Sequence, residues 1–359
     1  MSVAKSPKPR AAIAAIPAHP HSALPAPPPG ALLLNTNENR FGPSPAVYAA
    51  LRQDPAAMGL NDYPPAEAAP LNAALARQFG FEAHHIVSVA GGELLLPLAM
   101  LAFTEPGCEV VTFDDGFQKF LNYTLTCGAT PVAVPREADP TGAIQAALTP
   151  KTRIVLIDNP GNPTGWLLSP ETIAEIHASL PSDVLLILDE AYVEFSSFGQ
   201  FGLDLARDHR NVLTTRTFSK AYGLAGLRIG WAAGHRNVIE AVRRVIPTFP
   251  IPRPSLIGAL AALGDVDHLA SVTAEVGRIR DAAQTRLAAA GWDVAPSAAN
   301  FLLIRAGRHA PEAVAEAVET LRAANILVRL LPRFRNAPAI RMTLGTAEDM
   351  ARVYAALKI

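Results

Sequence analysis

The chain has 359 residues, of which 50% are hydrophobic and 18% are charged, and its formal net charge is −1. This balance predicts a globular protein with one large and one smaller domain, and it lacks the basic surplus typical of proteins that bind duplex DNA or RNA. The two cysteines, Cys108 and Cys127, are too few for a disulfide framework and are not spaced as a metal site, so we expect both to be reduced.

Residues 1–29 are rich in proline and alanine. The prolines break any continuous hydrophobic helix, so a secretory signal is not expected. No apolar run in the chain approaches the roughly 20 residues that span a bilayer. We therefore expect a flexible, extended N-terminal arm, followed by a segment at 30–53 that joins the small domain, in a cytoplasmic protein.

Residues 54–264 are expected to form the large domain, because short, almost continuously apolar runs alternate there with helical stretches. Such runs are typical of strands covered on both faces. Helices are expected at 93–103 and at 170–179, the second with Ser169 as its N-cap and Pro170 at its first position. The alternation predicts an α/β fold with a mainly parallel sheet flanked by helices. The expected strands are EVVTF (109–113), RIVLID (153–158), VLLILDE (184–190) and NVLTTR (211–216).

Residues 265–359 have a different pattern and are expected to form a smaller α+β domain. A long amphipathic helix is expected first, followed by a segment with strand character, and two further strands lie between two shorter helices. The expected elements are the helix at 268–289, the segment at 292–307, the helix at 312–324, the strands at 326–331 and 339–345, and a closing helix.

Polar side chains follow three consecutive strands of the predicted large sheet. The turn NPGNPTG contains Asn162, the next strand is followed by Asp189 and Tyr192, and the third is followed by Lys220. Each residue has an ordinary structural role in isolation: a turn residue, a helix cap, a packed tyrosine and a surface lysine. Because ligands bind at the carboxyl ends of strands in open α/β sheets, the four together predict a binding site.

Pyridoxal phosphate is a cofactor that needs this set of groups. Its aldehyde forms a Schiff base with a lysine, and its ring nitrogen is kept protonated by a buried carboxylate. Its phenolate oxygen needs hydrogen-bond donors such as an amide and a phenol. Its phosphate needs hydroxyls, backbone N–H groups and an arginine.

The chain resembles the fold-type I pyridoxal-phosphate aminotransferases, and among them the histidinol-phosphate aminotransferases, from about Leu34 to its C-terminus. That family has a large domain with a mainly parallel sheet and a smaller α+β domain. The motifs that carry the resemblance are LNTNENRFGPSP (34–45), NPGNPTG (159–165), DEAYVEF (189–195), TFSKAYGLAGLRIGW (217–231) and IRMTLGT (340–346).

The resemblance implies roles for the residues at the strand ends. Lys220 would bind the cofactor covalently and, once released by substrate, move the proton between the substrate α-carbon and the cofactor. Asp189 would pair with the ring nitrogen. Asn162 and Tyr192 would donate hydrogen bonds to the phenolate oxygen.

The resemblance also assigns a phosphate site to Thr217, Ser219 and Arg228. In VAGGELLL (89–96) the chain departs from the family, because Gly91 and Gly92 replace a hydroxyl and an acid. Backbone N–H groups at the start of that helix still suit an anion.

In FDDGFQKF (113–120), Phe117 lies where the family has a tyrosine that stacks on the pyridine ring, so stacking is expected without the hydroxyl. In NDYPPAE (61–67), Tyr63 would reach the phosphate of the cofactor in a neighbouring subunit. The resemblance therefore implies a homodimer with shared active sites.

The expected substrates, histidinol phosphate and glutamate, both present an anion to the same site. Arg341 matches the arginine with which the family binds carboxylates, and a guanidinium grips a carboxylate or a phosphate with two hydrogen bonds. Asn37 is assigned to the same site by the resemblance. Arg329 is either a second cation for the phosphate or an exposed strand residue. Arg40, where the family commonly has proline, is either a third arginine near the substrate or a surface change.

The implied reaction is histidinol phosphate + 2-oxoglutarate = imidazole acetol phosphate + glutamate, in L-histidine biosynthesis. An aromatic-amino-acid aminotransferase is an alternative with the same cofactor residues, and a phosphothreonine-type decarboxylase is a second. A transcription regulator with a domain of this fold is not expected, because residues 1–30 are too short and too proline-rich for a DNA-binding module.

Overall fold

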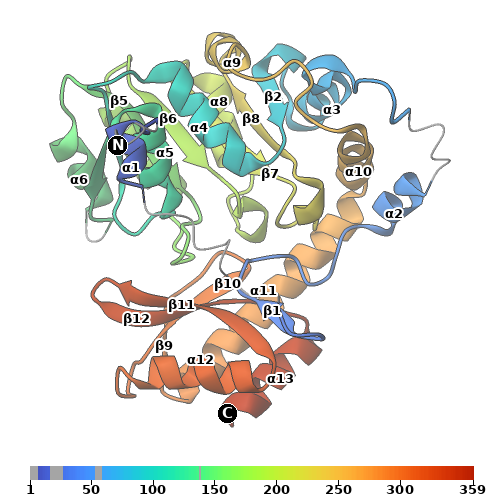
Figure 1. The fold of residues 1–359 in the computed structure, drawn as a ribbon, viewed down its shortest axis with the longest axis vertical. Coiled ribbons are helices and arrows are strands. Elements are labelled where there is room, and N and C mark those ends of the chain that lie inside the picture. The colour runs from blue at the N-terminus through green and yellow to red at the C-terminus, as the bar shows by residue number, and fades with distance from the viewer. Residues whose placement is uncertain (1–6, 17–26, 53–58, 137–138) are drawn as a thin grey trace, which may run out of the picture.

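The structure is a computed structural model that describes residues 7–16, 27–52, 59–136 and 139–359. Two sheets lie one above the other, and the long helix α11 (Val266–Ala289) runs from one towards the other (Figure 1). No single helix in the described part of the chain is long and apolar enough to cross a membrane. Taken together, α10 (Arg253–Gly264) and α11 are long and apolar enough, but the pair is bent by 77°.

The larger sheet has seven strands in the order β2-β8-β7-β6-β5-β3-β4. Among these strands only β8 runs against its neighbours. The strands predicted at 109–113, 153–158, 184–190 and 211–216 are all confirmed, with ends shifted by no more than one residue. The strands are β2 (Ile86–Val89), β3 (Glu109–Phe113), β4 (Thr130–Val134), β5 (Thr152–Asp158), β6 (Leu185–Asp189), β7 (Val212–Thr217) and β8 (Gly230–Gly234).

Strand β5 shows why these strands are apolar almost throughout. Ile154 and Leu156 belong to a core cluster on one face of the sheet, with side chains of α4, α5 and α9. Val155 and Ile157 belong to a second cluster on the other face, with side chains of α6, α7 and α8. Successive side chains point to opposite faces, and helices bury both.

The helices of the large sheet include both predicted ones. The predicted helix at 170–179 is confirmed, and the Ser169 side chain accepts a hydrogen bond from the Thr172 N–H as its N-cap. Two more helices, α3 and α10, pack in a further cluster beside β2 and β8. The helices are α2 (Pro45–Leu51), α3 (Ala69–Phe79), α4 (Gly92–Phe103), α5 (Lys119–Cys127), α6 (Pro140–Ala147), α7 (Pro170–Ser179), α8 (Phe201–Asp208), α9 (Arg236–Arg243) and α10 (Arg253–Gly264).

The smaller sheet has the strand order β1-β11-β12-β10-β9. Helices α11, α12 and α13 contribute to its core cluster. Strand β1 pairs in parallel with β11, with Leu32 opposite Ile326, so a segment near the N-terminus completes this sheet. The remaining elements are β1 (Leu32–Leu34), β9 (Asp293–Val294), β10 (Phe301–Arg305), α12 (Ala313–Ala323), β11 (Ile326–Phe334), β12 (Ala337–Thr343) and α13 (Ala347–Leu357).

The N-terminal arm differs from the expected extended chain where the structure describes it. Helix α1 (Ala11–Ala14) is a single turn, and beside it the Arg10 guanidinium donates a hydrogen bond to the Thr126 carbonyl at 2.6 Å. The rest of that prediction falls partly on residues 1–6 and 17–26, which lie outside the described residues. The domain boundaries at 29/30, 53/54 and 264/265 stay a prediction.

Candidate active site

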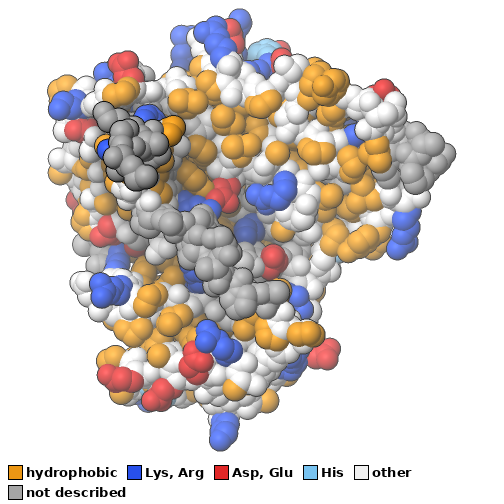
Figure 2. Space-filling model, in the orientation of Figure 1, with side chains coloured by type: hydrophobic (Ala, Val, Ile, Leu, Met, Phe, Trp, Pro, Cys, Tyr) orange, Lys and Arg blue, Asp and Glu red, His pale blue; other side chains and the backbone are white. Residues whose placement is uncertain are grey.

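A cavity of about 310 Å³ lies where the carboxyl ends of the large-sheet strands face the small sheet. Figure 2 shows charged side chains gathered in the hollow between these two parts of the molecule. Most predicted site residues line the cavity, although they come from distant parts of the chain. They are Asn37, Gly92, Phe117, Asn162, Asp189, Tyr192, Thr217, Ser219, Lys220, Arg228, Arg329 and Arg341.

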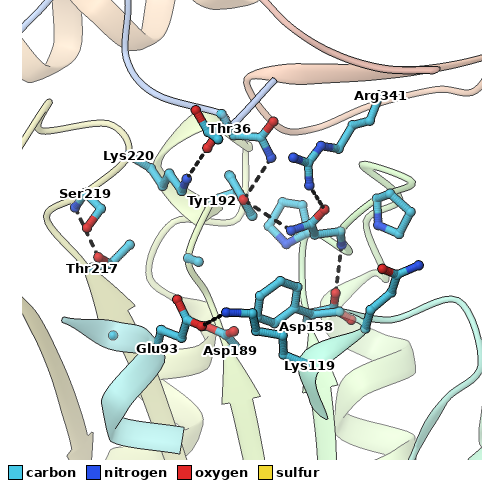
Figure 3. A pocket seen from close by; sticks show the side chains of 18 of the residues that line it. Thr36, Glu93, Lys119, Asp158, Asp189, Tyr192, Thr217, Ser219, Lys220 and Arg341 are labelled. Carbon is cyan, nitrogen blue, oxygen red and sulfur yellow. Dashed lines mark hydrogen bonds and ion pairs between the residues drawn. The ribbon is translucent and has the colours of Figure 1, made fainter. Parts of the chain in front are cut away.

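Lys220 lies just after β7, in the turn that leads towards β8. Its amine donates a hydrogen bond to the Thr36 carbonyl at 3.0 Å and lies 5.5 Å from the centre of the Tyr192 ring (Figure 3). Both neighbours belong to the cavity wall, so the amine is held inside the cavity.

Asp189 is the last residue of β6, and its carboxylate accepts a hydrogen bond from the Thr215 hydroxyl at 3.1 Å. Burial among the strands raises the pKa of Asp189 to about 7, and the nearby Asp158 carboxylate adds to the shift. No described residue forms an ion pair with Asp189. A cationic group of a ligand would therefore find a carboxylate without a counter-ion here.

The Tyr192 hydroxyl oxygen accepts hydrogen bonds from two side-chain amides. Asn37 donates to its oxygen at 3.0 Å and Asn162 at 3.4 Å. A phenol oxygen has two acceptor positions and one hydrogen to donate. Both acceptor positions are used, which leaves the Tyr192 hydrogen for a further acceptor.

Thr217, Ser219 and Arg228 lie together at one end of the cavity. The Ser219 N–H donates to the Thr217 hydroxyl at 3.0 Å, and Arg228 donates to the Ser219 hydroxyl at 3.4 Å. A Cβ added to Gly91 would lie 2.7 Å from an Arg228 nitrogen, so the backbone ahead of α4 closely adjoins the guanidinium. Gly91 has φ 103°, a conformation that favours glycine. A helix N-terminus, hydroxyls and an arginine together form an anion site.

Two arginines of the small sheet face the same cavity. Arg329 and Arg341 lie opposite each other in the β11–β12 pairing. Arg341 donates to the Asn162 side-chain oxygen at 2.7 Å and to the Asn35 carbonyl at 2.8 Å. Burial lowers the pKa of Arg341, and Arg329 acts in the same direction, but a guanidinium stays charged at neutral pH.

Four charged residues that line the cavity were not predicted: Glu93, Lys119, Asp158 and Arg216. Arg216 lies in β7 and forms an ion pair with Glu190 at 2.8 Å. Glu93 and Lys119 form an ion pair at its wall. Asp158 is the last residue of β5 and lies opposite Asp189 in the sheet. A signal for Asp158 was present, because it ends the predicted strand RIVLID and directly precedes the turn that was assigned to the site.

Three residues considered for the site are not among those that line the cavity. One is Gly91, whose backbone adjoins Arg228. Tyr63 is 77% exposed and stacks on Phe249 with ring centres 4.5 Å apart. Arg40 forms an ion pair with Asp349 of α13 at 3.2 Å, which gives it a structural partner in the small domain.

The sequence-family model of the class I and II aminotransferases matches residues 29–357. The chain belongs to this family. The curated histidinol-phosphate aminotransferase of Erythrobacter litoralis is 42% identical over 332 residues, covering 89% of this chain and 88% of that protein. The curated aromatic amino acid aminotransferase of Thermobifida fusca is 39% identical over 312 residues, covering 86% of each.

Among solved structures, the histidinol-phosphate aminotransferase of Sinorhizobium meliloti in complex with pyridoxal-5′-phosphate is 30% identical. It superposes with a TM-score of 0.83 over 91% of this chain and 89% of its own. The fold predicted from the sequence, a fold-type I aminotransferase with a mainly parallel sheet, is confirmed.

Proposed function

We propose that this aminotransferase uses pyridoxal phosphate to transfer an amino group from histidinol phosphate to 2-oxoglutarate, a reversible step of L-histidine biosynthesis. The observation that carries the proposal is one cavity that holds Lys220, Asp189 and the arginine pair Arg329 and Arg341. The first two suit the cofactor, and the pair suits substrates that end in a carboxylate or a phosphate.

The cavity fits the cofactor in charge and in hydrogen bonding. Asp189 is an acid without a cationic partner among the described residues, as a protonated ring nitrogen requires. Tyr192 has a hydrogen to donate, as a phenolate oxygen requires. Phe117 lines the same cavity and presents a ring for stacking. The Arg228 end provides an anion site for the phosphate.

Pyridoxal phosphate, when bound, supplies an electron sink for the substrate α-carbon. Lys220 would serve as the base and acid, because its amine would take the proton from the substrate α-carbon and deliver it to the C4′ carbon of the cofactor. Asp189 would keep the ring nitrogen of the cofactor protonated, and Tyr192 and Asn162 would orient the ring. Arg341 binds the distal anion of each substrate in turn, with Arg329 adding charge for a phosphate.

We also propose a cytoplasmic homodimer with shared sites. Exposed apolar side chains gather over α2, α10 and the adjacent chain (Figure 2). Tyr48, Leu60, Tyr63, Phe249 and Val266 are 40% to 77% exposed. A second copy of the chain covering this surface would bury them and bring Tyr63 to a neighbouring cavity.

An aromatic amino acid aminotransferase stays the second candidate, because a relative of similar identity carries that name. Purified protein should be assayed with 2-oxoglutarate and either histidinol phosphate or phenylalanine. Faster turnover of histidinol phosphate supports the proposal, and faster turnover of phenylalanine overturns it. Carbon dioxide release without any keto acid would instead indicate a decarboxylase.

A further inference from the structure

A buried ion network lies behind the active site and has no role in the mechanism above. Arg136 follows β4 and is 0% exposed. Its guanidinium donates to the Asp115 carboxylate at 2.8 Å and to the Asp158 carboxylate at 2.8 Å. The three residues follow or end the neighbouring strands β3, β4 and β5, at the edge of the sheet where the cavity lies.

This network is connected to the active site through Asn162. The second oxygen of Asp158 accepts the Asn162 backbone N–H at 2.7 Å. Arg136 also donates to the Asp158 carbonyl at 3.3 Å. A Cβ added to Gly161 would lie 3.0 Å from an Arg136 nitrogen, so the turn at 159–165 packs directly against the guanidinium. The position of Asn162 is therefore set by Arg136 and Asp158 on its backbone side.

The side chain of Asn162 lies between the cofactor end and the substrate end of the cavity. It donates to the Tyr192 hydroxyl and accepts from Arg341 (Figure 3). A shift of the Asn162 backbone would move both contacts. Misplacement by about 1 Å can cost about 100-fold in rate, even when the displaced group only orients the reactants.

The energy of a buried ion network argues for such a role. Removing charges from water costs several kcal/mol per ion, and well-packed apolar side chains often stabilise a fold equally well. The network also reaches the small sheet, because the other Asp115 oxygen accepts from Arg335 at 3.2 Å. Arg335 lies in the turn between β11 and β12, the two strands that carry Arg329 and Arg341.

We propose that Arg136 is a positioning residue: through Asp158 it fixes Asn162, and thereby the orientation of Arg341 for the distal anion of the substrate. Asp115 extends this positioning to the β11–β12 turn. The inference rests on the proposed function only through the role of Arg341 as the anion-binding residue.

The test is the affinity for glutarate, which has the carbon chain of glutamate but no amino group to transfer, measured by calorimetry on enzyme loaded with cofactor. Arg136→Met should weaken glutarate binding by about tenfold or more and lower kcat/KM by about 100-fold. It leaves Asp158 as a buried charge without its partner. The double variant Arg136→Met/Asp158→Asn removes that charge and keeps an oxygen for the Asn162 N–H, but it still lacks the guanidinium, so its affinity for glutarate should stay below that of the wild type.

Arg243→Met is the matched control, because Arg243 also bonds backbone carbonyls of the large domain but lies away from the cavity. It should bind glutarate like the wild type. Glutarate affinity within twofold of the wild type in Arg136→Met overturns the proposal. Full recovery in the double variant also overturns it, because the loss would then come from the buried Asp158 charge alone. If Arg136→Met does not fold, Arg136→Lys replaces it. Lysine keeps the positive charge but cannot donate to both carboxylates in the planar geometry of a guanidinium. Unchanged glutarate affinity in Arg136→Lys overturns the proposal.

Glutarate binding requires no turnover. Inactivity of the wild type towards histidinol phosphate would thus overturn the proposed substrate and leave this test in force.

Discussion

Asp158 and Asp189 lie directly opposite each other at the carboxyl ends of β5 and β6. The two carboxylates differ in their partners. Asp158 is ion-paired with Arg136, while Asp189 accepts from the Thr215 hydroxyl. Burial raises the pKa of both carboxyls, and the one without an ion pair is the one that a protonated ring nitrogen would meet.

The pKa of Asp189, raised to about 7, predicts how the cofactor-free protein responds to pH. In the unfolded chain this carboxyl titrates near its ordinary value of about 3.9. Between about pH 4 and pH 7 the native state holds the extra proton, so raising the pH costs up to about 1.4 kcal/mol of stability per unit from this group. Above about pH 7 the penalty stays constant.

Asp189→Asn removes this titration. The difference in Tm between the cofactor-free variant and the cofactor-free wild type should therefore rise in favour of the variant from pH 5 to pH 8, as measured by calorimetry. Comparing the two proteins at each pH cancels the titration of all other groups to first order. A difference that stays constant with pH would show that Asp189 titrates normally.

Lys220 is expected to be the site of covalent attachment. Lys220→Ala should lose at least about 1000-fold in turnover, because it removes both the attachment point and the proton-transferring amine. Borohydride reduction followed by peptide mass spectrometry should find no modified residue in this variant. Lys119→Ala is the control within the same cavity, and it should still be modified at Lys220. Modification of Lys119 in the wild type would contradict the prediction, because the cofactor would then be attached to Lys119 and not to Lys220.

Substitutions of the two arginines of the small sheet are expected to differ in which substrate they affect. Arg341→Met should lower kcat/KM by about 100-fold for glutamate and for histidinol phosphate, since it removes charge-assisted hydrogen bonds worth about 1.5–3 kcal/mol each. Arg329→Met should affect histidinol phosphate more than glutamate, because a phosphate dianion gains more from a second cation. Steady-state kinetics with both substrates measure this. Normal turnover in Arg341→Met would remove that residue from the site.

Most of the large sheet could be predicted because strands such as β3, β5 and β6 are buried on both faces and are therefore apolar almost throughout. Strand β8 (Gly230–Gly234) could not be predicted in the same way, because glycine and alanine fill four of its five positions. Its composition has a packing reason: a Cβ on Gly230 would lie 2.1 Å from the Gly92 nitrogen at the start of α4. Close approach of two backbones leaves no hydrophobic signal in the sequence.

Asn162, Asp189 and Lys220 could be predicted to lie together because each ends or follows a strand with a recognisable pattern. Arg136 could not, since in the sequence it is one cation in the run VPRE, and its partners lie 21 and 22 residues away. Only the strand order β5-β3-β4 brings the three charges together. Sequence order alone does not give that spatial order.

The proposed sharing of the active site between two subunits gives the last prediction. Tyr63 is highly exposed in the single chain and lies outside its cavity, as expected for a residue that serves a second subunit. Tyr63→Ala and Lys220→Ala should each be poorly active alone. A mixed dimer has one site with both substitutions and one site with neither, so it should regain about half the activity of a wild-type dimer.

The mixed dimers can be prepared by unfolding and refolding the two variants together and isolated with two different affinity tags. Mixing either variant with itself is the control and should restore nothing. If the mixed dimer is no more active than its parents, Tyr63 and Lys220 act within one chain or Tyr63 has no part in the site. A monomeric wild type in light scattering would contradict the shared site directly, because no second chain would then be present to supply Tyr63.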